Sequence, residues 1–239
     1  MWVEIIILIT AAAAAFIQVT TGFGISIIIM TVLPMIMPVA ESSFLLCFSA
    51  VIVTSYIILK YWKSINFKSL ILPLAFALAG SYLGVTALLK TENYIAVKFL
   101  GSLLIILALY FYKYQNRIKI PKNIFSASTA GICSGLMNGF FNMGGPPIVL
   151  YYSTMTEDKN EYSATVQFFF AVMAVFKIIV LILGNGAPVN VFVHVPLAAA
   201  GSLVGMFAGI YLFKKLSIDT IKKFIYIIMI IAGIWYIIK

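Results

Sequence analysis

The sequence predicts an all-α polytopic membrane protein made of two related halves, and three observations carry this prediction. Hydrophobic residues make up 63% of the chain and charged residues only 10%, with a mean hydropathy of +1.11. Soluble domains are about 45–50% apolar and about 25% charged. Apolar runs long enough to cross a bilayer recur along the whole chain. A glycine-containing polar motif also interrupts two of these runs, at residues 18–26 and 138–146.

Eight apolar segments are expected to be helical. They cover residues 3–37, 42–59, 69–89, 94–112, 124–153, 163–183, 191–213 and 220–238. The first and the fifth exceed the ~20 residues that one crossing needs, so we expect each to be two shorter helices that meet at the polar motif. No linker or soluble domain separates the segments. Residues 1–239 are therefore expected to form a single transmembrane transporter domain.

The similarity between the halves extends beyond the motifs. At an offset of 120 residues Gln18 corresponds to Asn138, and Gly24 corresponds to Gly144. We expect repeat 1 to cover about residues 1–118 and repeat 2 about residues 119–239. Each repeat would begin with a broken, hairpin-like helix and continue with three transmembrane helices.

The distribution of basic residues predicts the topology. The net charge of +9 does not indicate a nucleic-acid partner, because Lys and Arg lie mainly in short loops, as the positive-inside rule expects. If the fifth segment is a hairpin, twelve of them share one side: Lys60, Lys63, Lys68, Lys113, Arg117, Lys119, Lys122, Lys159, Lys214, Lys215, Lys222 and Lys223. Only Lys90, Lys98 and Lys239 lie on the other side. The first segment is expected to be a hairpin by its similarity to the fifth. The halves would then be inverted in a multi-pass protein of the cell (plasma) membrane, with the basic loops in the cytoplasm.

Broken helices in corresponding positions of two inverted halves are typical of a transporter's binding site near the bilayer midplane. Free N–H groups at helix N-termini favour an anion, and glycine lets the backbone approach it closely. The residues predicted to contact a small anionic substrate are Gln18, Thr20, Thr21, Gly22, Gly24, Ser26, Asn138, Asn142, Gly144, Gly145, Pro146, Gln167 and Lys177. The glycine pairs Gly80/Gly84 and Gly201/Gly205 are instead expected to allow close helix packing.

The two motifs also resemble those of the TauE/SafE family of sulfite exporters. The resemblance rests on Gly22-Phe-Gly24 followed by Pro34, and on Asn142-Met-Gly-Gly-Pro-Pro147 followed by Glu161. It implies two four-segment halves and export of a small sulfur oxyanion or an organosulfonate. Asn142 stands where the family pattern leads us to expect a further glycine.

All seven acidic residues lie in termini or loops, so no buried carboxylate is available to carry a proton. An anion that leaves a cell with an inside-negative potential gains about 2.3 kcal/mol per charge per 100 mV. Alternating access driven by the membrane potential is therefore the predicted mechanism. Lys177 is the only charge well inside a predicted span, and it either takes part in the site or extends its stem toward the interface.

Other functions are weighed against this one. An intramembrane enzyme would need a nucleophile–base pair or a metal cluster, and the chain has one histidine, His194, and no buried acid. Cys47 and Cys133 are expected to be packing residues, and no cofactor or metal is expected. A passive anion channel and a membrane assembly or structural protein without transport stay open as alternatives. The lipid bilayer is the expected surrounding, and a homo-oligomer is left open.

Overall fold

The structure is a computed structural model that describes residues 2–22, 24–114, 120–184, 189–212 and 218–238. These residues form helices and no strand. The long helices are α1 (Trp2–Thr21), α3 (Val39–Tyr61), α4 (Phe67–Lys90), α5 (Asn93–Tyr114), α6 (Ile124–Phe141), α8 (Lys159–Leu183), α10 (Val195–Leu212) and α11 (Ile218–Ile238). The short ones are α2 (Ile25–Val32), α7 (Gly145–Met155) and α9 (Val189–Phe192), with 3-10 turns at Leu33–Met35 and Trp62–Ser64. The predicted all-α class is confirmed.

Side-chain caps explain where three of the helices begin. Asn66 and Asn123 precede α4 and α6, and each accepts the backbone N–H three residues on, at 3.1 and 2.8 Å. Asp158 precedes α8 and accepts two N–H groups of its first turn, both at 2.8 Å. Each cap satisfies donors that have no partner within the helix.

Six of the described helical segments are long and apolar enough to cross a membrane. They are Trp2–Thr21, Val39–Ser64, Phe67–Lys90, Asn93–Lys113, Lys159–Leu183 and Asn190–Leu212. Large apolar side chains such as Ile71, Phe99 and Phe207 are more than half exposed, as they would be against lipid. In contrast, 67% of the span in α3 is buried, which makes α3 the central helix. The chain is therefore a multi-pass membrane protein.

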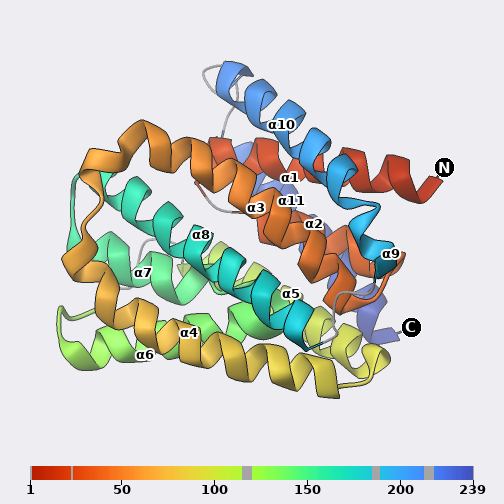
Figure 1. Cartoon of the computed structure of the whole chain (residues 1–239), viewed down its shortest axis with the longest axis horizontal. Helices are drawn as coiled ribbons and strands as arrows, with labels where there is room; N and C mark the ends of the chain where they lie inside the picture. The colour runs from red at the N-terminus through yellow and green to blue at the C-terminus, as the bar shows by residue number, and fades with distance from the viewer. Residues whose placement is uncertain (1, 23, 115–119, 185–188, 213–217, 239) are drawn as a thin grey trace.

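Both long segments that were predicted to be broken are hairpins. Figure 1 shows that α1 begins and α2 ends at the same end of the bundle, because the chain reverses between them. The second hairpin, α6 and α7, begins and ends at the opposite end. The two hairpin tips thus enter the bundle from opposite ends.

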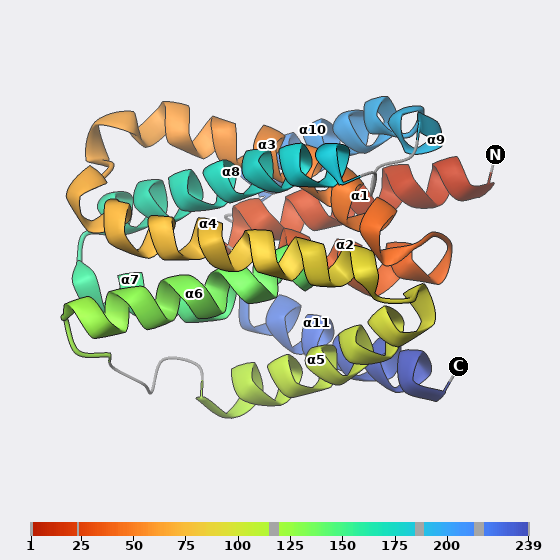
Figure 2. The ribbon, with the colours of Figure 1, turned by 60° about the horizontal axis from the view of Figure 1, so that its bottom comes forward.

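The helix pairing has the same form in both halves. α1 packs on α10 and α6 packs on α4, while α3 pairs with α8 and α5 pairs with α11. If α1 is exchanged for α6, α3 for α8, α4 for α10 and α5 for α11, the same four pairs result. Successive helices of the second half also run opposite to those of the first (Figures 1 and 2). An inverted repeat would produce this arrangement, and the division at about residue 118 stays a prediction.

Three of the four basic regions predicted to be cytoplasmic lie at one end of the bundle, and the fourth, between α10 and α11, includes residues 213–217, which lie outside the described residues. The ends of α3, α5 and α7 and the starts of α4, α6 and α8 share this end, which carries Lys63, Lys68 and Lys122 (Figure 2). Lys90, between α4 and α5, lies at the other end. Arg117, Lys119, Lys214, Lys215 and Lys239 lie outside the described residues. The cytoplasmic assignment of the basic end stays a prediction.

Glycines bring the paired helices into backbone contact. A Cβ atom on Gly80 or Gly84 of α4 would lie 2.7 or 2.6 Å from a backbone oxygen of α6. A Cβ on Gly201 or Gly205 of α10 would overlap a backbone oxygen of α1. The packing role predicted for these two glycine pairs is confirmed, since no larger residue fits at these contacts.

Candidate functional site

The first hairpin tip, between α1 and α2, is held by two glutamine side chains. Gln18 Nε2 donates to the Gly22 carbonyl at 3.3 Å and to Gln167 Oε1, on α8, at 3.1 Å. Gln18 Oε1 accepts the N–H of Ile25, the first residue of α2, at 3.2 Å. Gln167 Nε2 donates to the Gly22 carbonyl at 2.9 Å. The φ angles of Gly22 and Gly24 are +82° and +125°, which only glycine adopts readily, so the chain can reverse here.

The second hairpin tip, between α6 and α7, is held by asparagine and serine. Asn142 ends α6 in the left-handed conformation, with a φ of 58°, and its N–H donates to the Asn138 carbonyl at 2.8 Å. Its Nδ2 donates to the Ser43 carbonyl, on α3, at 2.9 Å. The Gly144 carbonyl accepts the Ser134 hydroxyl at 2.6 Å. A Cβ on Gly144 would overlap the Ser134 carbonyl, so the tip is closed tightly onto α6.

Each tip is bound by the helix that follows the hairpin of the other half. Gln167 of α8 holds Gly22, and Cys47 of α3 lies 3.7 Å from Asn142 Nδ2. Cys47 and Gln167 are 120 residues apart, as are Gly22 and Asn142. Both tip residues also have positive φ, and asparagine is one of the few other residue types that tolerate it. Asn142 therefore keeps the bend that a glycine would allow.

A cavity of about 60 Å³ lies between the two tips. One water molecule requires about 10–15 Å³ of such space, so the cavity has room for a compact ion. Its wall is mostly apolar, with contributions from α3, α5 and α8 as well as both hairpins. The lining residues are Gln18, Gly24, Ile25, Ser26, Ile27, Leu46, Cys47, Ala50, Thr54, Leu107, Phe111, Asn138, Asn142, Met143, Gly144, Gly145, Pro146, Phe170 and Ala174.

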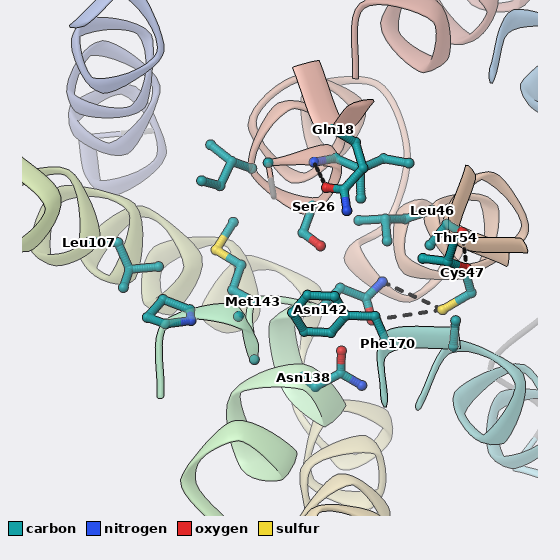
Figure 3. Close-up of a pocket in the computed structure, with 18 of the residues that line it drawn as sticks. Gln18, Ser26, Leu46, Cys47, Thr54, Leu107, Asn138, Asn142, Met143 and Phe170 are labelled. Atoms are coloured by element: carbon teal, nitrogen blue, oxygen red, sulfur yellow. Dashed lines mark hydrogen bonds between the residues drawn. The ribbon is translucent and has the colours of Figure 1, made fainter. Parts of the chain in front are cut away.

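Polar groups from both hairpins converge on this cavity. Figure 3 shows the Ser26 hydroxyl directed toward the cavity with the Asn138 side chain on its other side, while the Asn142 amide is turned toward Cys47 and Ser43 of α3. Asn138 Nδ2 is buried and has no hydrogen-bond partner among the described residues. The first turns of α2 and α7 border the cavity as well, and helix N-termini carry partial positive charge. Among the first three residues of α7 only Gly145 has an N–H group, because Pro146 and Pro147 have none. A buried donor without a partner is costly, so this arrangement favours a bound hydrogen-bond acceptor.

The wall of the cavity carries no negative charge. None of its lining residues is acidic, and Glu41 and Glu161 lie in the first turns of α3 and α8, at the ends of the bundle. Among the residues that the structure describes, no group of three His, Cys, Asp or Glu side chains could hold a metal ion. The cavity therefore suits an anion that is bound by dipoles and amide donors.

Eight of the predicted contact residues line the cavity: Gln18, Gly24, Ser26, Asn138, Asn142, Gly144, Gly145 and Pro146. Thr20, Thr21, Gly22, Gln167 and Lys177 do not line it. The hydroxyl groups of Thr20 and Thr21 donate to the Ile17 carbonyl, at 3.0 and 2.8 Å. Gly22 and Gln167 hold the first tip from behind, so they position the site without lining it.

Lys177 does not extend toward the membrane interface. The side chain is 0% exposed, and its Nζ donates to the Asn138 carbonyl at 2.9 Å and to the Ser43 hydroxyl at 3.4 Å. The interpretation of Lys177 as a side chain that reaches the interface is therefore wrong. The reason is that its face of α8 is turned toward α3 and the second hairpin tip.

Sequence reasoning missed Cys47, which lines the cavity and contacts Asn142. The signal for it was present, because Cys47 corresponds to Gln167 at the offset of 120 residues. Cys133, in contrast, is exposed on α6 rather than packed in the interior.

Comparison with protein families gives one match that covers nearly the whole chain. The family model described as "Sulfite exporter TauE/SafE" matches residues 7–236. Neither the curated proteins nor the solved structures gave a match. The matched range includes both hairpin tips and every residue that lines the cavity.

Proposed function

This chain belongs to the TauE/SafE sulfite exporter family of membrane transporters, and we propose that it carries a small sulfur oxyanion or organosulfonate out of the cell. The observation that carries the proposal is the cavity between the two hairpin tips, whose lining includes Asn138, a residue with a buried side-chain N–H group that has no partner among the described residues. A compact anion with several acceptor oxygens would satisfy this donor.

The chemistry of the cavity favours an anion over a cation or a neutral solute. The N-termini of α2 and α7 supply partial positive charge, and the lining residues supply no carboxylate. The apolar remainder of the wall, including Leu46, Met143 and Phe170, excludes water and strengthens each polar contact. A sulfonate or sulfite group presents acceptor oxygens on several sides, so donors from both hairpins can bind it together.

Alternating access would arise from movement of the two halves around this site. The bonds from Gln167 to Gly22 and from Asn142 to Ser43 tie each tip to the other half. Relative movement of the halves would break one set of these bonds at a time and open the cavity toward one side. The membrane potential would drive export, since no carboxylate near the cavity is placed to carry a coupling proton.

Reconstitution into liposomes tests the proposal. Proteoliposomes loaded with labelled sulfite, thiosulfate or sulfoacetate should release the anion with saturable kinetics, and external unlabelled anion should accelerate exchange. Ohmic single-channel currents would show a passive channel instead. Absence of flux and of any anion-dependent thermal stabilisation would favour a structural or assembly protein.

A further inference from the structure

Lys177 is a buried cation without a buried anion. Its ammonium group is fully enclosed between α3, α6 and α8 and donates only to neutral oxygens, those of Asn138 and Ser43. No ion pair of Lys177 is found among the residues that the structure describes. No described carboxylate therefore balances its charge.

Such a charge is costly in a membrane interior unless something compensates for it. Part of the compensation comes from the end of α6, because the Asn138 carbonyl lies in its last turn, where the helix dipole is negative. Carbonyl and hydroxyl groups alone leave the net charge in place. Such a group either loses its proton or gains a compensating charge, and in this site a mobile anion would supply that charge.

The cavity is where that ion would be bound. Asn138 accepts a hydrogen bond from the Lys177 ammonium through its backbone carbonyl and also lines the cavity, so one residue separates the ammonium from the ligand space. Cys47 likewise lines the cavity, and it lies one turn of α3 from Ser43, the other hydrogen-bond partner of Lys177. An anion between the tips would thus be close to the ammonium with no acidic group between them.

We propose that Lys177 is the counter-charge of the transported anion, a positioning residue that gives the cavity its selectivity for negative charge without contacting the ligand. This inference rests on the proposed function. The counterpart of Lys177 in the first half is Ile57, at the offset of 120 residues, so the site carries this charge on one side only. One fixed charge matches one anion for each cavity.

The test compares Lys177→Met, which has nearly the same shape and no charge, with Lys98→Met. The control removes the same charge from an exposed position on α5. Thermal unfolding in detergent is recorded in an anion-poor buffer and across a sulfite titration. We expect Lys177→Met to unfold at a temperature equal to or above that of the wild type without sulfite, because a buried unbalanced charge is gone. Its apparent Kd for sulfite should rise at least tenfold, whereas Lys98→Met should match the wild type.

A purely structural role predicts the opposite pair of results. Lys177→Met would then unfold at a lower temperature than the wild type and keep the wild-type Kd for sulfite. An unchanged Kd overturns the proposal, whether or not the unfolding temperature falls. Lys177→Arg provides the second variant: it keeps the charge and alters the hydrogen bonds, so sulfite should still stabilise it. Loss of sulfite stabilisation in both variants would assign the effect to geometry and overturn the counter-charge.

The failure of the proposed substrate class is distinguishable from the failure of this inference. Chloride or acetate could stabilise the wild type but not Lys177→Met, while sulfite and thiosulfate stabilise neither protein. In that case the counter-charge role of Lys177 stands, and the proposal of a sulfur anion as substrate is wrong. If no anion stabilises the wild type, both ideas are wrong.

Discussion

Asn138 provides the sharpest test of the cavity, because its side chain has a donor that the empty site leaves unused. The change is Asn138→Ala, which removes Nδ2 and breaks no hydrogen bond of that amide. A hydrogen bond to a charged group contributes about 1.5–3 kcal/mol. At about 1.4 kcal/mol per factor of ten, the Kd for the anion should rise about 10- to 150-fold.

The stability of the empty protein should change in the other direction or not at all. Alanine favours a helix more than asparagine does, and the variant no longer buries an unpaired donor. Asn123→Ala is the matched control, since it makes the same change at the start of the same helix. Asn123 caps α6 by accepting the Ser126 N–H at 2.8 Å, so its loss should cost about 1 kcal/mol of unfolding free energy and leave the Kd unchanged.

The assay is an anion titration of both purified variants, followed by thermal unfolding and by binding calorimetry. A wild-type Kd in Asn138→Ala would refute the reasoning, because the amide would then take no part in binding. An equal loss of affinity in Asn123→Ala would also refute it, since the effect would then follow the stability of α6 rather than the donor.

Three further predictions follow from the fold and the proposed mechanism. Gly205→Ala should lower the unfolding temperature, because the added Cβ would overlap the Ala12 carbonyl of α1. Gly145→Ala should fold normally, since its Cβ would meet only Phe170, at 3.8 Å. Equal unfolding temperatures of the two variants would contradict the packing of α10 on α1. The topology can be tested in a variant without native cysteines, with an impermeant thiol reagent added to intact cells. The reagent should label Lys90→Cys but neither Lys68→Cys nor Lys122→Cys. Labelling of only one of the latter two would exclude a shared cytoplasmic end. In loaded proteoliposomes an interior-negative potassium diffusion potential should speed anion efflux, and efflux that ignores the potential but follows an imposed pH gradient would exclude the uniport mechanism.

The two bends were predictable from the sequence because their cause is local. Gly22 and Gly24 permit backbone angles that other residues avoid, and apolar runs too long for one crossing required a break. The convergence of the tips was also predictable, since the inverted repeat expected from the duplicated motif would bring both copies to one interface.

The directions of individual side chains were not predictable, because they depend on tertiary contacts. Thr20 and Thr21 bond to carbonyls of their own helix, a local option that serine and threonine always have and that composition does not reveal. Lys177 could reach the interface or the interior with equal ease on an isolated helix. Only the packing of α8 against α3 and α6 places its ammonium beside Asn138.

The central claim is that an anion is bound between the two hairpin tips, and selenite tests it most directly. Selenite replaces sulfite with a heavier atom that scatters X-rays anomalously, so crystals grown with it reveal the position of the selenium. The account predicts an anomalous peak in the cavity, with an oxygen of the ion within hydrogen-bond distance of Asn138 Nδ2 and near Ser26. A peak elsewhere in the bundle, or an empty cavity at saturating selenite, would contradict it.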